Sequence, residues 1–153
     1  MIRAFIIELF ATFFYVGYLP FFPGTWASLI AAGIFFLLPS ISVLYMVMLT
    51  FFLGLIAIWI SHKFEQTLKI PDASCIVLDE VVGMSIALVG IPKQLYLYLL
   101  AFIFFRIFDI SKIPPINIIE EKVHGGWGVV GDDVIAGLMA RGCVALLISC
   151  VTF

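Results

Sequence analysis

The stretch SVLYMVMLTFFLGLIAIWIS, residues 42–61, decides the fold class of this chain. It holds no charged side chain, and a helix of about 20 residues rises about 30 Å, the thickness of the hydrocarbon core of a membrane. The whole chain has the same character: 64% of its 153 residues are hydrophobic and 12% are charged. Soluble domains average about 45–50% and about 25%. Lipid is therefore the expected solvent for most of this chain.

The composition also excludes several classes of protein. A soluble enzyme of this size could not cover so much apolar surface, and a mean hydropathy of +1.24 excludes a disordered chain as well. Eight Lys and Arg residues against ten Asp and Glu leave no basic excess for binding nucleic acid. The three cysteines, an odd number without CxxC spacing, are expected to pack as small apolar side chains.

Prolines and charged residues divide the chain into about six apolar segments. We predict an all-α, polytopic integral membrane helical bundle that forms one domain over residues 1–153. The segments are 4–19, 26–38, 42–61, 76–91, 94–111 and 132–152. The third and sixth are long enough to span a membrane, the fourth is short, and the first two are candidates for short or re-entrant helices. Glu8 and the lack of a small-residue cleavage site before Pro20 indicate that the first segment is no cleaved signal peptide.

The loops between these segments assign the two faces of the bundle. If all six segments cross, loops 20–25, 62–75 and 112–131 share one face. These loops carry Lys63, Lys69, Lys112 and Lys122. Because cytoplasmic loops hold the excess of Lys and Arg, this face is predicted to be cytoplasmic.

Most of the polar side chains gather toward that same face. They come from the start of the fourth segment, the end of the fifth and the start of the sixth, with a glycine-rich turn between the last two. The set is Asp79, Glu80, Arg106, Asp109, Lys112, His124, Asp132 and Asp133. Charged groups at membrane depth usually face a bundle interior with partners, so we expect these pieces of chain to meet.

This set has the chemistry of a phosphate-handling site. Its five carboxylates suit a hard cation such as Mg²⁺ and are too acidic to crowd together without one. Arg106 and Lys112 can hold phosphate oxygens, the arginine through two parallel hydrogen bonds. Together they predict phosphoryl chemistry on a membrane-embedded substrate. The alternative is that each acid caps a helix or is solvated at the interface.

Two glycine-containing turns are further candidates for phosphate contacts. Residues 126–131 read GWGVVG and match G-x-G-x-x-G, but no βαβ pattern surrounds them, so dinucleotide binding is not expected. Gly125 and Gly126 are expected instead to offer backbone N–H groups at a helix start. Thr25 and Ser28 place hydroxyls after a Pro-Gly pair, where a plain N-cap is an equal alternative.

Four stretches together resemble bacterial phosphatidylglycerophosphatase A. They are PFFPGTWAS (20–28), IVLDEVVGM (76–84), FRIFDISKIPPI (105–116) and HGGWGVVGDD (124–133), in order along nearly the whole chain. The resemblance implies a Mg²⁺-dependent phosphatase, multi-pass in the bacterial cytoplasmic (inner) membrane. Its substrate would be a membrane phospholipid, phosphatidylglycerophosphate, hydrolysed to phosphatidylglycerol and inorganic phosphate. Ala27 and the Ile113-Pro114 pair depart from the family pattern without changing a charged position.

The residues and the resemblance together lead to a hypothesis about the roles of individual residues. Those expected to take part in catalysis are Asp79, Glu80, Arg106, Asp109, Lys112 and His124. Those expected to bind substrate are Thr25, Ser28, Arg106, Lys112, Gly125 and Gly126. The expected Mg²⁺ ligands are Asp79, Glu80, Asp132 and Asp133. Asp72 falls on a further acidic position of the family, and the attacking group, water or a carboxylate, stays open.

A small ion-coupled transporter or channel is the alternative function that the residues themselves leave open. It would use the intramembrane acids and Arg106 as an ion path, and it predicts charge spread through the membrane depth. Most of the charge in this chain falls toward one end of the expected helices instead. A non-catalytic scaffold would leave the acidic clusters unexplained.

Overall fold

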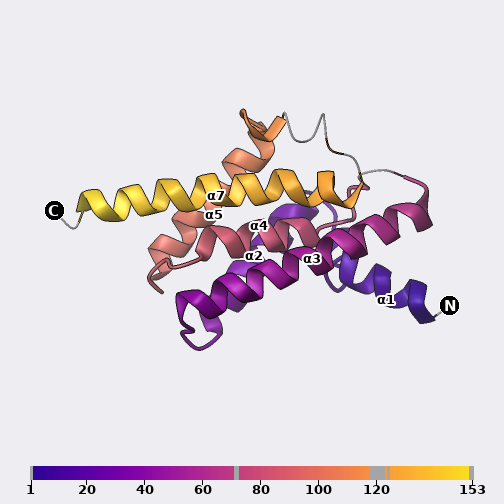
Figure 1. Cartoon of the computed structure of the whole chain (residues 1–153), viewed down its shortest axis with the longest axis horizontal. Helices are drawn as coiled ribbons and strands as arrows, with labels where there is room; N and C mark the ends of the chain where they lie inside the picture. Colours follow the sequence, from indigo (N-terminus) through magenta and orange to yellow (C-terminus); the bar gives the residue numbers. More distant parts are fainter. Residues whose placement is uncertain (1, 71–72, 118–122, 124, 152–153) are drawn as a thin grey trace.

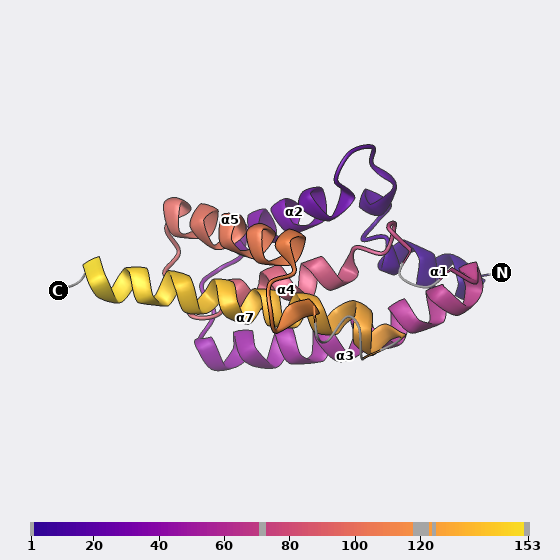
Figure 2. The ribbon, with the colours of Figure 1, turned by 90° about the horizontal axis from the view of Figure 1, so that it is seen from above.

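The computed structural model describes residues 2–70, 73–117, 123 and 125–151 of the chain. Within these residues the fold is all-α and contains no strand. The elements are α1 (Ile2–Ala11), the 3-10 helix η1 (Val16–Tyr18), α2 (Pro23–Leu37), α3 (Val43–Leu68), α4 (Leu78–Leu88), α5 (Leu95–Ser111) and α7 (Gly126–Val151). Figures 1 and 2 show the long helices α3 and α7 flanking the short α4.

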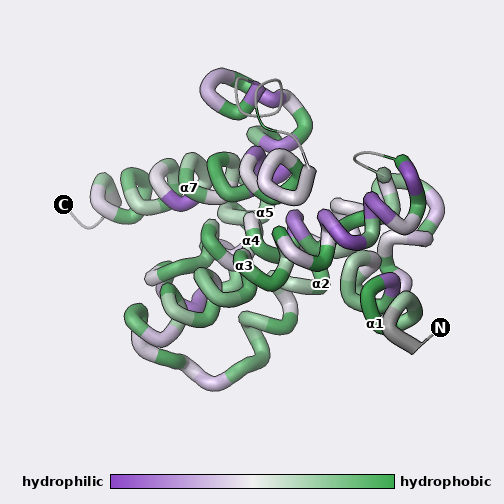
Figure 3. Tube along the Cα trace, turned by 45° about the vertical axis from the view of Figure 1, so that its right-hand side comes forward, coloured by the Kyte–Doolittle hydropathy of each residue, from purple (hydrophilic) through white to green (hydrophobic). Residues whose placement is uncertain are grey.

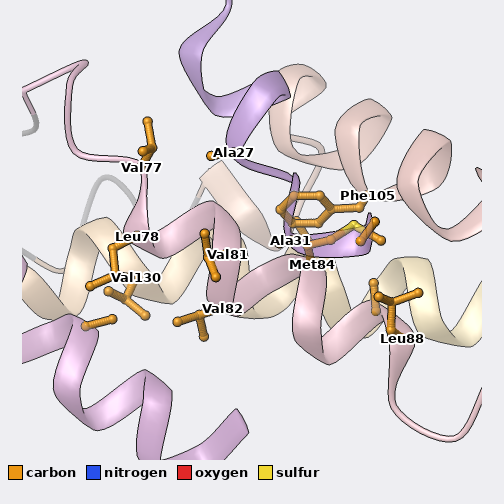
Figure 4. Packing of buried hydrophobic residues seen from close by; sticks show 14 of the residues in the cluster. Ala27, Ala31, Val77, Leu78, Val81, Val82, Met84, Leu88, Phe105 and Val130 are labelled. Carbon is orange, nitrogen blue, oxygen red and sulfur yellow. The ribbon is translucent and has the colours of Figure 1, made fainter. Parts of the chain in front are cut away.

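The short helix α4 is the centre of the bundle. Helices α2, α3, α5 and α7 all pack against it, and nine of its eleven residues are buried. Figure 4 shows the side chains of Ala31, Met84 and Phe105 meeting where α2, α4 and α5 come together. Because α4 is enclosed, any polar side chain on it is held inside the bundle rather than in solvent.

Glycines allow the backbones of α4 and α7 to approach closely. A Cβ atom built at Gly137 would overlap the backbone oxygen of Gly83. A Cβ at Gly83 would lie 2.7 Å from the backbone oxygen of Asp133 and 2.5 Å from the ring of Phe105. The small residue at Gly83 therefore permits close helix packing, which brings Asp133 against α4.

Two helices have the length and composition of membrane spans. These are α3, Val43–Leu68, and the part of α7 from Gly126 to Cys150, while α2 is apolar but shorter. In the most apolar 18-residue stretch of each helix, only 22% of α3 and 28% of α7 is buried, so most of their apolar side chains face outward. An outward apolar surface of this extent is typical of helices that lie in lipid.

The two ends of the bundle differ in character. The Lys93 ammonium donates a hydrogen bond to the backbone oxygen of Leu38, so turns 39–41 and 92–93 lie together, as the sequence predicts. Hydrophilic residues gather instead toward the C-terminal ends of α3 and α5 (Figure 3). The N-termini of α2 and α4 lie at this second, polar end, because Ser28 contacts Arg106 near the end of α5 and Gly24 packs against Glu80 in the first turn of α4.

The first apolar segment, 4–19, holds a short helix, one of the two forms predicted for it. Helix α1 ends at Ala11, and the chain continues through a turn and the η1 helix. Thr12 stabilises this break: its hydroxyl donates to the backbone oxygen of Glu8 and accepts from the backbone N–H of Tyr15. Hydroxyl side chains compete in this way with helical hydrogen bonds.

Two other helices are longer than predicted. Helix α3 continues beyond residue 61 to Leu68, because polar pairs one turn apart, such as His62 with Gln66 at 3.0 Å, support the added turns. Helix α7 begins at Gly126, after Gly125 turns the chain at φ 70°, so the GWGVVG stretch is helical. The prediction that Asp132 and Asp133 open the last helix is therefore wrong.

Two unassigned side chains have structural roles. The Arg141 Nε on α7 donates a hydrogen bond to the backbone oxygen of Val89, where α4 ends. Burial raises the pKa of the Cys75 thiol, which lies in the loop before α4. A neutral thiol there agrees with a packing role.

Candidate active site

Three carboxylates meet at the polar end of the bundle. Asp79 and Glu80 lie in the first turn of α4, as predicted, and Asp133 lies about two turns into α7. One oxygen from each of the three falls within 4.8 Å of the others. Asp79 is 7% exposed and Asp133 only 4%, so the group, called the acidic trio below, is enclosed by protein.

The acidic trio is short of compensating partners. Among the described residues, Oε2 of Glu80 and Oδ1 of Asp133 are buried and accept no hydrogen bond. Two like unit charges about 5 Å apart repel by roughly 3 kcal/mol at an effective dielectric constant of about 20. A buried group of this kind requires a cation or protons. The oxygen-only donor set and the two unpartnered oxygens fit a hard divalent cation.

Arg106 lies beside the trio, one helix away. Its guanidinium forms an ion pair of 2.5 Å with Asp109, the residue three positions on, as the spacing predicts. The same guanidinium lies 3.5 Å from the hydroxyl oxygen of Ser28 on α2. Its Nε is buried with no hydrogen-bond partner in the described part of the chain. Arg106 is thus held in place while one N–H donor remains available to an anion.

Lys112 and Asp132 form a second pair at the edge of the site. The Lys112 ammonium lies 3.5 Å from the Asp132 carboxylate, and the lysine is 34% exposed. Asp132 also accepts a hydrogen bond of 2.9 Å from the backbone N–H of Asp133. The compact trio therefore contains three of the four expected metal ligands, and Asp132 faces Lys112 at its border.

The N-terminus of α2 closes the site from the other side. A Cβ atom built at Gly24 would overlap Oε1 of Glu80 and lie 3.3 Å from a guanidinium nitrogen of Arg106. Ser28 is fully buried, and its hydroxyl donates a 2.7 Å hydrogen bond to the backbone oxygen of Gly24. The sequence reasoning singled out Thr25 and Ser28 but not Gly24. The Pro-Gly pair that precedes them was the available signal.

The remaining predicted residues have separate positions. Thr25 is half-buried directly after Gly24, next to the site. Gly125 and Gly126 lie against α3, where a Cβ at Gly125 would be 3.1 Å from Nδ1 of His62. His62 is not among the site residues predicted from the sequence, and its place beside this turn adds it to the candidates. The predicted residues Asp72 and His124 lie outside the described residues.

This arrangement can bind a cation and an anion side by side. The carboxylates come from α4 and α7, and the guanidinium comes from α5. Such a pairing at one end of an apolar bundle suits a phosphate group carried by a lipid. Because GWGVVG is helical, it offers no Gly-rich phosphate loop, in agreement with the rejection of dinucleotide binding.

The helical bundle, with its two candidate membrane spans and its acid–arginine site, fits the class of phosphatases that act on lipids. A family model confirms the class in more detail. The model described as phosphatidylglycerophosphatase A matches residues 9–148. The chain belongs to the phosphatidylglycerophosphatase A family and is an enzyme, which sets aside the transporter alternative.

Curated relatives agree with this family. The chain is 34% identical to phosphatidylglycerophosphatase A of Escherichia coli K12 over 137 residues, covering 88% of this chain and 79% of that protein. It is 36% identical to the Haemophilus influenzae protein of the same name, covering 88% and 83%. A Bacteroides thetaiotaomicron protein, named as a candidate phosphatidylinositol-3-phosphatase, is 39% identical over 88% of this chain and 89% of its own length. No solved structure matches this chain.

Proposed function

We propose that this enzyme hydrolyses phosphatidylglycerophosphate to phosphatidylglycerol and inorganic phosphate, with Mg²⁺, at the cytoplasmic face of a bacterial inner membrane. The observation that carries the proposal is the acidic trio with two unpartnered oxygens beside an arginine with an unpartnered Nε. The names of the Escherichia coli and Haemophilus influenzae relatives support the substrate.

Asp79, Glu80 and Asp133 are the residues that would hold Mg²⁺. Their closest carboxylate oxygens lie within 4.8 Å of one another, and two of their buried oxygens lack a partner. A bound Mg²⁺ would supply charge neutralisation and polarisation of a phosphoryl oxygen and of water. Asp132 lies next to this group and forms an ion pair with Lys112, so its carboxylate partly neutralises the lysine charge at the edge of the site.

Arg106 binds and orients the phosphate monoester in this proposal. Asp109 and Ser28 fix the guanidinium, so little side-chain entropy is lost when a phosphate engages the Nε–H. Lys112, at the exposed edge, adds a point charge for the outer phosphate oxygens. Gly24 leaves the space in which Glu80 and Arg106 approach the backbone of α2.

The reaction requires two proton movements. An attacking water loses a proton as its oxygen bonds to phosphorus, and the departing glycerol oxygen gains one as the P–O bond breaks. His124 or a carboxylate of the trio handles these protons. The alternative is direct attack by a trio carboxylate, which would form an acyl phosphate that water then hydrolyses.

The face of the membrane is inferred from the lysines. Lys63 and Lys112 lie toward the polar end of the bundle, and positive charge near membrane spans favours the cytoplasmic side. Substrate phosphate would then reach the site from the cytoplasmic headgroup layer.

Phosphatidylinositol 3-phosphate is a second candidate substrate, favoured by the name of the Bacteroides thetaiotaomicron relative. Both lipids carry a phosphate monoester on a polar headgroup, so the described site recognises the group that they share. The test is phosphate release by detergent-purified enzyme from each lipid at equal concentration with Mg²⁺. A higher kcat/KM for phosphatidylglycerophosphate supports the proposal, and a higher value for the inositol lipid would replace it.

A further inference from the structure

An apolar groove between α2 and α5 begins where the polar site ends. It has a volume of about 120 Å³ and is lined by Leu29, Ala32, Gly33, Phe36, Leu95, Tyr98, Leu99 and Phe102. The two helices are antiparallel neighbours: Ser28 meets Arg106 at the polar end, and the rings of Phe36 and Tyr98 meet at 5.3 Å toward the other. The groove therefore runs along the membrane depth.

The groove lies next to the phosphate-binding residues along both helices. On α2, Leu29 directly follows the buried Ser28. On α5, Phe102 lies four residues before Arg106, one turn along the same side of the helix. A molecule that contacted the Arg106 guanidinium with its polar end could thus extend its apolar part between the two helices.

Gly33 leaves a space in the groove that is filled by no group of the described residues. A Cβ built at Gly33 would meet no atom of the described residues within 4 Å outside its own helix, and Gly33 is exposed. Gly24, two to three turns earlier in the same helix, is in contrast packed against Glu80. Leu29 and Leu99, 41% and 46% exposed, form the walls. Gly142 on α7 is equally open, so what distinguishes Gly33 is its place in the lining of the apolar groove, where a linear apolar ligand can lie beside it.

We propose that this groove holds an acyl chain of the phospholipid whose phosphate binds Arg106 and the acidic trio. The inference rests on the proposed function and extends it to the second half of the substrate. Because lipid tails are as apolar as leucine, the groove adds little affinity within a membrane. It acts by orientation, since a fixed chain aligns the headgroup with the site.

The test fills the groove with a side chain. Gly33→Phe places a ring in the open space, and Gly142→Phe is the matched control, because Gly142 is also helical and has nothing within 4 Å. Phosphate release is measured with dioleoyl phosphatidylglycerophosphate and with its deacylated product, glycerophosphoglycerophosphate. We expect Gly33→Phe to lower kcat/KM on the dioleoyl lipid roughly tenfold and to leave the deacylated substrate unaffected. Gly142→Phe should change neither.

Two results would contradict the proposal that the groove holds an acyl chain. One is an unchanged kcat/KM on both substrates, and the other is an equal loss on both, which would assign the effect to the polar site.

A second experiment tests the groove without hydrolysis. In the Asp79→Asn enzyme, a lipid with a diazirine on one acyl chain should crosslink to peptides 29–36 and 95–102, and crosslinks elsewhere would contradict the proposal. If the wild-type enzyme hydrolyses neither substrate, the proposed function is wrong. The crosslinks alone then test whether the groove binds an acyl chain.

Discussion

At the scale of single residues, charge balance governs the site. Asp79, Glu80 and Asp133 bring three carboxylates within 4.8 Å, and the bundle encloses two of them almost completely. Removing water from like charges costs free energy that packing must offset. The three carboxylates, which are the proposed cation ligands, are therefore expected to lower the free energy of unfolding when no cation is bound.

Asp79→Asn is predicted to separate stability from activity. Without a divalent cation, loss of one buried charge should stabilise the protein by about 1–3 kcal/mol and raise its unfolding temperature in detergent. Phosphate release with Mg²⁺ should fall at least roughly a hundredfold, because a ligand is lost. Glu65→Gln, at the polar end of α3 and outside the trio, is the control and should leave phosphate release unchanged. A variant that unfolds earlier and keeps its activity would show that the trio is a structural network.

The sequence allowed some of these contacts to be predicted. The Arg106–Asp109 pair follows from helical spacing alone, because residues three apart share one side of a helix. The meeting of Asp79 with Asp133 depends on which faces of two distant helices pack together, and no local rule supplies that. Asp132 was expected to join them, but it points to Lys112 because neighbouring residues of a helix face different directions.

At the scale of elements, close backbone contacts position the site. The N-terminus of α2 reaches Glu80 and Arg106 only because Gly24 has no side chain. We predict that Gly24→Ala displaces the Glu80 carboxylate and lowers kcat for phosphate release roughly tenfold or more. Gly142→Ala, in open space on α7, should retain wild-type kinetics. Equal kinetics for both variants would mean that the contact at Gly24 does not serve the reaction.

The contact between α4 and α7 provides a test of stability on the same principle. A methyl group at Gly137 would overlap the backbone oxygen of Gly83, so Gly137→Ala should separate the helices and destabilise the fold by about 1–3 kcal/mol. Gly142→Ala, five residues further along the same helix, should be neutral or stabilising by up to about 1 kcal/mol. Thermal unfolding in detergent compares them, and a lower unfolding temperature for Gly142→Ala than for Gly137→Ala would contradict this packing.

Helix boundaries were harder to predict than helix positions. Helix α5 covers Leu95–Ser111 against a prediction of 94–111, because a proline and a charge flank it. Helix α7 begins at Gly126 although its first turns are rich in glycine, a poor helix former. Tertiary contacts determine where α7 begins. Gly126 packs against the backbone of Ile58 on α3, and that packing favours a helix over a loop at this position.

At the scale of the whole molecule, the bundle has one polar and one apolar end. The turns at Ser40 and Lys93 lie together opposite the acidic trio. In a cysteine-free background, Ser40→Cys should react with a membrane-impermeant maleimide on intact spheroplasts. Ser74→Cys, in the exposed loop before α4, should react only after lysis. Labelling of both positions from outside, or the reverse pattern, would contradict the proposed orientation.

The central claim is that the acidic trio and Arg106 form a Mg²⁺-dependent phosphatase site for a lipid phosphate monoester. Its most direct test is phosphate release from phosphatidylglycerophosphate by the detergent-purified enzyme, measured with Mg²⁺, with EDTA, and after Mg²⁺ is restored. We predict release with Mg²⁺, at least roughly a hundredfold less with EDTA, and full recovery when the ion returns. Equal release in the presence of EDTA would contradict the metal-dependent site, and no release under any condition would contradict the proposed substrate.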